Sequence, residues 1–96
     1  MRIGIDIMGG DYAPDKVIEG VLLALDSLSK NIELFLFGPD IILNNLDDKI
    51  KKCKNVKFIS CTEVIEMNEH PTKAFKEKPN SSIAKGFSFL KNNQID

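Results

Sequence analysis

Apolar and polar positions along the chain follow the periods of strands and helices. Residues 2–8 (RIGIDIM) place three isoleucines on one face, with the two-residue period of a strand. Over residues 14–29 the apolar positions recur at helical spacing, which predicts an amphipathic helix. The apolar run 32–37 (IELFLF), which a Gly-Pro pair ends, predicts a second strand.

The same patterns continue through the second half of the chain. An apolar stripe that begins after Asp40 predicts another helical element, with that aspartate as its cap. Residues 55–60 predict a third strand and residues 81–93 a final helix, and the polar stretch 68–80 between them predicts a short helical turn around 73–77. Strands that alternate with helices imply parallel pairing, so the fold class is an open α/β sheet with Rossmann-like α/β/α layers.

Three strands form a thin sheet with exposed edges. A final helix followed by NNQID stands where such a fold begins its next strand. We therefore expect residues 1–96 to be the N-terminal portion of a larger single domain.

Composition narrows the classes of function. The formal net charge is −1, which gives no general attraction to nucleic acid or to an anionic membrane. No apolar run approaches the ~20 residues that a membrane span needs. The spacing of Cys53 and Cys61 fits neither a redox pair nor a zinc knuckle, and His70 is the only histidine, so we expect two reduced thiols and no metal site.

The turn after the first strand carries the first candidate chemistry. Gly9 and Gly10 lie between the carboxylates of Asp6 and Asp11, just before the first predicted helix. Glycines let backbone N–H groups approach a ligand, and a helix N-terminus favours an anion, so this turn is a candidate phosphate cradle. The structural alternative is a tight turn with Asp11 as a helix cap. Dinucleotide-binding, P-loop and nucleophile-elbow motifs are absent from the sequence.

The segment 60–86 carries the second candidate site. It is rich in lysine, and Ser81 and Ser82 open the last predicted helix. These groups could together hold a second anion at a helix N-terminus. The structural alternative is that the lysines are solvated and one serine is an N-cap; Ser60 and Glu63 likewise fit the spacing of a capping box.

Two stretches together resemble a known family. "DIMGGDYAP" (6–14) and "EVIEMNEHPTKAFKEKPNSSI" (63–83) closely resemble the bacterial phosphate acyltransferases of phospholipid synthesis, the PlsX family, in order and at the expected separation. The resemblance implies an enzyme that converts acyl-acyl carrier protein and inorganic phosphate to acyl phosphate, on a sandwich fold related to phosphotransacetylases. Tyr12 and Lys76 depart from the family pattern, and family members are roughly three times longer.

The resemblance also implies roles for residues and partners. Asp6 and Asp11 would orient catalytic loops, and Lys73 and Lys76 would contact the carrier protein. Phosphate binding falls to Gly9, Gly10, Lys78, Ser81 and Ser82.

The implied enzyme needs no cofactor or metal and no nucleic acid. It is a cytoplasmic homodimer that touches the membrane peripherally through residues outside this chain. It passes its product to a membrane glycerol-3-phosphate acyltransferase. This 96-residue piece alone is expected to be inactive. Two alternatives stay open: a non-catalytic Rossmann-like module that binds an anion or nucleotide, and a structural fragment without a function of its own.

Overall fold

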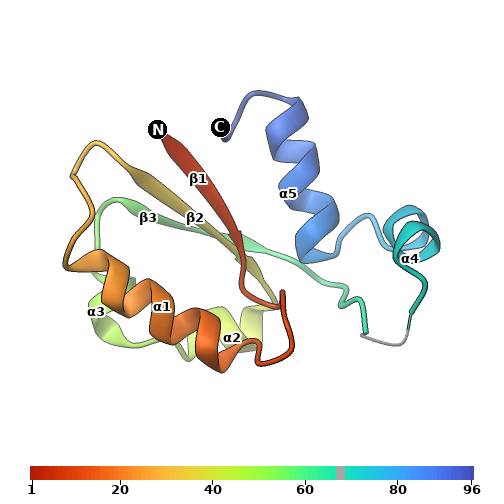
Figure 1. Cartoon of the computed structure of the whole chain (residues 1–96), viewed down its shortest axis with the longest axis horizontal. Coiled ribbons are helices and arrows are strands. Elements are labelled where there is room, and N and C mark those ends of the chain that lie inside the picture. The colour runs from red at the N-terminus through yellow and green to blue at the C-terminus, as the bar shows by residue number, and fades with distance from the viewer. Residues whose placement is uncertain (67–68) are drawn as a thin grey trace.

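The computed structural model describes residues 1–66 and 69–96. Strands and helices alternate in the first half of the chain, and two helices follow the last strand (Figure 1). The strands are β1 (Arg2–Asp6), β2 (Glu33–Gly38) and β3 (Val56–Ser60). The helices are α1 (Asp15–Leu25), α2 (Asp40–Asn44), α3 (Asp48–Lys51), α4 (Pro71–Glu77) and α5 (Ser82–Lys91).

The three strands form one parallel sheet in the order β1-β2-β3. In the register, Asp6 of β1 lies opposite Phe37, and Gly38 of β2 lies opposite Ser60. The carboxyl ends of all three strands therefore meet at one edge of the sheet. Together with the helices, this sheet confirms the open α/β fold predicted from the sequence.

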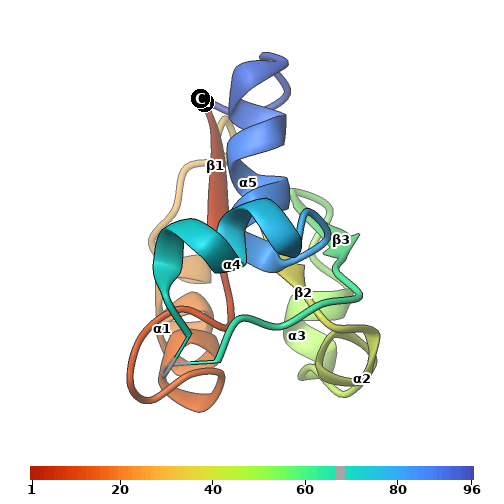
Figure 2. The same ribbon diagram turned by 90° about the vertical axis from the view of Figure 1, so that its right-hand side faces the viewer.

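The central strand has a hydrophobic core on each of its faces. Leu34 and Leu36 pack toward α1–α3, whereas Phe35 and Phe37 pack toward α5, with Phe89 edge-on to both rings. The two views show α1, α2 and α3 on one side of the sheet and α5 on the other (Figures 1 and 2). Burying a side chain of this size contributes about 1.5–3 kcal/mol, so β2 anchors both layers.

The helix predicted over 14–29 is shorter than its apolar pattern suggested. Helix α1 ends at Leu25, and the N–H groups of Ser27 and Leu28 both donate to the carbonyl of Ala24. Leu28 still packs against the core from the turn that follows. The pattern therefore reported burial correctly beyond the point where the helix stops.

The stripe that begins after Asp40 forms two short helices rather than one element. Asp47 has extended backbone angles (φ −55°, ψ 140°), and its carboxylate accepts the Lys49 N–H at 2.8 Å as the N-cap of α3. An aspartate that caps a new helix interrupts the preceding one. Pro39, not Asp40, holds the N-cap position of α2. No helix among the described residues is both long and apolar enough to cross a bilayer.

Candidate functional site

The first turn begins at the carboxyl end of β1, where Asp6 is half-buried. Its Oδ1 accepts the N–H of Met8 at 2.9 Å, and its backbone carbonyl accepts the N–H of Gly9 at 3.1 Å. Burial raises the pKa of Asp6, while the Met8 N–H and the hydroxyl of Ser82 act in the opposite direction. This carboxylate therefore organises the turn that follows it.

The two glycines of the turn serve different purposes. A Cβ at Gly9 would stand 3.3 Å from the carbonyl oxygen of Asp6, whereas a Cβ at Gly10 would meet nothing within 4 Å. Gly10 has φ +97°, a conformation that side chains disfavour. The Gly9 N–H is already spent on Asp6, so a ligand in this turn has to rely on other donors.

Asp11 lies exposed, away from the position of a helix cap. Pro14 is the N-cap residue of α1, with no side-chain hydrogen bond. The alternative in which Asp11 caps that helix is therefore wrong. Its role as a loop-orienting residue stays a prediction, since the structure assigns its carboxylate no hydrogen bond among the described residues.

The N-terminus of α5 faces the same edge of the sheet. Ser81 is the N-cap, and its Oγ accepts the N–H of Ala84 at 3.4 Å. Ser82 is 5% exposed and, with Asp6, lines one end of a groove between β1 and α5. Of the two predicted serines, Ser81 thus serves the helix, and Ser82 faces Asp6.

Cys61 follows β3 and is buried beside the same groups. Burial raises the pKa of its thiol, and the neighbouring Ser82 hydroxyl and Lys85 ammonium lower it in part. A buried thiol whose pKa is raised is a poor nucleophile at neutral pH. Asp6, Cys61, Ser82 and Lys85 thus form one polar cluster, the carboxyl-edge cluster, where the strands end.

Sequence reasoning did not select Lys85 as a site residue. Its Nζ donates to the carbonyl oxygen of Ser60 at 2.6 Å, which holds the ammonium over the end of β3. A cation in the first turn of a helix opposes the helix dipole. A lysine three residues after Ser82 was therefore the signal that could have separated it from the solvated lysines.

Lys78 has a different environment from the one predicted. Its Nζ donates to the carbonyl of Val64 at 2.8 Å and to Oε1 of Glu69 at 2.5 Å. The same Glu69 oxygen accepts the N–H of Glu66 at 3.0 Å, and the bond from Lys78 lowers the pKa of Glu69. Lys78 therefore ties the loop before α4 to the end of that helix, and its charge is already paired.

Lys73 and Lys76 lie exposed on α4, the helix that the sequence predicted as a short turn. The capping box predicted from Ser60 and Glu63 is wrong, because Ser60 ends a strand. The carboxylate of Glu63 accepts the N–H of Asn80 at 3.1 Å instead, which steadies the entry to α5. Among residues 1–66 and 69–96, no group of three acidic, histidine or cysteine side chains could hold a metal ion.

Comparison with known proteins places the chain in a family. The model of a family described as "Fatty acid synthesis protein" matches residues 1–96. The chain therefore belongs to this family. It is 45% identical over 96 residues to the "Phosphate acyltransferase" of Caldanaerobacter subterraneus subsp. tengcongensis, covering 100% of this chain and 28% of that protein.

Two further relatives agree with this. The "Phosphate acyltransferase" of Halothermothrix orenii is 46% identical over 92 residues, or 95% of this chain and 27% of its own length. That of Caldicellulosiruptor saccharolyticus is 41% identical over 96 residues, or 100% of this chain and 29% of its own length. The chain thus spans under a third of the length of these relatives.

Proposed function

We propose that this chain is part of a phosphate acyltransferase, which transfers an acyl group from acyl-acyl carrier protein to inorganic phosphate. The observation that carries the proposal is the family match over the whole chain, together with relatives that bear the name phosphate acyltransferase. These names favour an enzyme over a non-catalytic anion-binding module.

The reaction is a single displacement at a thioester carbonyl. A phosphate oxygen attacks the carbonyl carbon, the C–O bond forms, and the C–S bond breaks. The thiolate of the carrier protein leaves and takes up a proton, so the products are acyl phosphate and free thiol. No enzyme-bound acyl group is required, which agrees with the buried Cys61 thiol and its raised pKa.

The carboxyl-edge cluster supplies groups that suit this chemistry. The Ser82 hydroxyl and the Lys85 ammonium would bind phosphate at the N-terminus of α5, where the helix dipole favours an anion. Asp6 would accept the Ser82 proton and so orient that hydroxyl. Gly10 and Asp11 would shape the opposite wall, and Lys78 would act indirectly by fixing the segment before α5.

Partners follow from the same proposal. Lys73 and Lys76 on α4 offer exposed positive charge to the acidic carrier protein. The acyl phosphate would pass to a membrane glycerol-3-phosphate acyltransferase. The enzyme would work in the cytoplasm as a homodimer and touch the membrane peripherally through residues outside this chain.

The test compares two serines of α5 in the full product of the native gene. Thiol release from acyl-acyl carrier protein is measured against phosphate concentration for the wild type, Ser82→Ala and Ser88→Ala. Ser82 is buried in the cluster, whereas Ser88 is exposed on the same helix. Losing one hydrogen bond to a charged ligand costs about 1.5–3 kcal/mol, so Ser82→Ala should lower kcat/KM for phosphate roughly 10- to 100-fold.

Ser88→Ala should match the wild type, and thermal melting checks that both variants are folded. If no preparation releases thiol in a phosphate-dependent manner, the proposed activity is wrong. If release is phosphate-dependent but Ser82→Ala leaves it unchanged, the activity stands and the placement of phosphate at α5 is wrong.

A further inference from the structure

The outer edge of β1 carries backbone groups that the three strands leave unused. The N–H of Ile7 donates to the carbonyl of Phe37 at 3.1 Å, and the carbonyl of Met1 accepts the N–H of Glu33 at 2.9 Å. Successive residues of a strand point their backbone groups to opposite edges, so odd-numbered residues face β2. The groups of Arg2, Gly4 and Asp6 therefore point outward.

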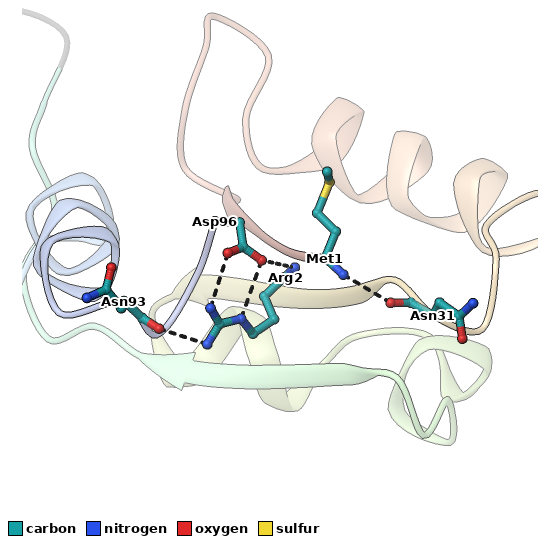
Figure 3. Close-up of polar contacts among 5 residues, drawn as sticks. All are labelled: Met1, Arg2, Asn31, Asn93 and Asp96. Atoms are coloured by element: carbon teal, nitrogen blue, oxygen red, sulfur yellow. Dashed lines mark hydrogen bonds and ion pairs between the residues drawn. The ribbon is translucent and has the colours of Figure 1, made fainter.

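The end of the chain already occupies the start of this edge. The N–H of Asp96 donates to the carbonyl of Arg2 at 2.7 Å, and the N–H of Arg2 donates to Oδ2 of Asp96 at 2.8 Å (Figure 3). The guanidinium of Arg2 adds bonds to both carboxylate oxygens of Asp96 and one to the carbonyl of Asn93 at 2.8 Å. This end of the chain is thus held against the first residue of β1.

Packing supports the same placement. Ile95 is 8% exposed and belongs to the core between the sheet and α5. A Cβ at Gly4 would stand 2.6 Å from Cδ1 of Ile95, so the absence of a side chain at Gly4 makes room for it. Beyond Ile95, the groove of about 160 Å³ continues along Gly4 and Asp6 under Phe87 and Leu90, which are 53% and 43% exposed.

We propose that the outer edge of β1 pairs with a parallel strand that continues directly from Asp96. The bond from the Asp96 N–H to the Arg2 carbonyl has the form of the bond from Glu33 to Met1, which opens the parallel pair β1–β2. In that register the Gly4 N–H donates to the Asp96 carbonyl, and the Asp6 N–H donates to the second residue beyond Asp96. The relatives, of which this chain covers 28%, have the length to supply such a strand.

The added strand changes what the site is. The strand order becomes β3-β2-β1 followed by the new strand, and α5 crosses the sheet on the face opposite α1 (Figure 2). The order then reverses at β1, and ligands of open α/β sheets bind where it reverses, beyond the carboxyl ends of the strands. The carboxyl-edge cluster is therefore one wall of a crevice, and the loop after the new strand is the other.

A strand from a second copy fits the edge less well. It would have to displace Ile95 and the Arg2–Asp96 contacts before it could pair with the start of β1. The new strand, in contrast, needs only to continue the direction in which residues 95 and 96 already run. Its side chains toward α5 are expected to be apolar, because they would cover Phe87 and Leu90.

Amide hydrogen exchange in the full product of the native gene tests the proposal without reference to activity. The Asp6 N–H points to the outer edge, and the Ile7 N–H, bonded to β2, is the internal control. We expect the Asp6 amide to be protected to within about 10-fold of Ile7, at two protein concentrations alike. An Asp6 amide that exchanges over about 100-fold faster than Ile7 overturns the proposal, as does protection that grows with protein concentration.

A proline variant identifies the pairing partner. A proline at the second residue beyond Asp96 removes the N–H that would donate to the Gly4 carbonyl. It should speed Asp6 exchange at least about 10-fold and leave Ile7 unchanged. Unchanged Asp6 exchange in a folded variant would show that another segment covers the edge; if the variant does not fold, the wild-type comparison decides.

Discussion

Gly38 ends β2 beside the candidate site, and a methyl group added there has no room. A Cβ at Gly38 would stand 2.4 Å from both Cγ1 and Cδ1 of Ile7, a residue that is 0% exposed. Inserting a methyl group into a packed core costs about 1–3 kcal/mol. Gly38→Ala should therefore lower the free energy of unfolding by that amount.

Gly20 provides the matched control for this change. It lies inside α1, and a Cβ there would meet nothing within 4 Å. The same glycine-to-alanine change should stabilise the protein by roughly 0.5–1 kcal/mol, because alanine favours the helix. Urea unfolding of both variants and the wild type, followed by circular dichroism, measures the two free energies with opposite expected signs.

A double-mutant cycle tests the cause of the destabilisation. Ile7→Ala removes the two atoms that the new methyl group would strike, at a cost of about 2–5 kcal/mol by itself. If the clash is the cause, Gly38→Ala in that background should cost at least about 1 kcal/mol less than in the wild type. A Gly38→Ala protein as stable as the wild type, or a cycle without coupling, would refute the steric argument.

Three further changes probe the site. Because burial raises the pKa of Asp6 above 3.8, its ionised form opposes folding at neutral pH, and the opposition fades as pH falls through the folded-state pKa. The stability of Asp6→Asn relative to wild type should therefore shrink between pH 7 and pH 4.5 in urea unfolding; a relative stability that grows would contradict the burial argument. Gly10→Ala should cost about 1–2 kcal/mol from its φ of +97°, measured by the same unfolding, and a neutral change would contradict the conformation. Lys78→Met should speed proteolytic cleavage before α4 several-fold, because it frees Val64 and Glu69, while Lys73→Met should not; equal rates would refute the tie.

The sequence was sufficient to predict the layers of the fold. The isoleucines of β1 pack on the face that their alternation predicted, and β2 reads as a continuous apolar run because helices cover both of its faces. Helix ends were less predictable. A buried stripe persists through turns, as Leu28 and Leu46 show, so apolar spacing alone does not reveal where a helix stops.

The site was predictable in its location but not in its partners. Both candidate segments lie at the carboxyl edge of the sheet, and Ser82 faces Asp6 from a position 76 residues away in the sequence. Which donor is spent elsewhere depends on three-dimensional contacts. The pairing of Lys78 with Glu69 and the seat of Lys85 on Ser60 arise from loops that no periodic pattern describes.

The most direct test of the proposed function is the fate of the phosphate itself. The full product of the native gene is incubated with an acyl-acyl carrier protein and isotopically labelled inorganic phosphate, and hydroxylamine then traps any acyl phosphate as the hydroxamate. Transfer of the label into an acyl phosphate, in step with the thiol released, is the predicted result. Release of free fatty acid, with all of the label still inorganic, would contradict phosphate as the acyl acceptor.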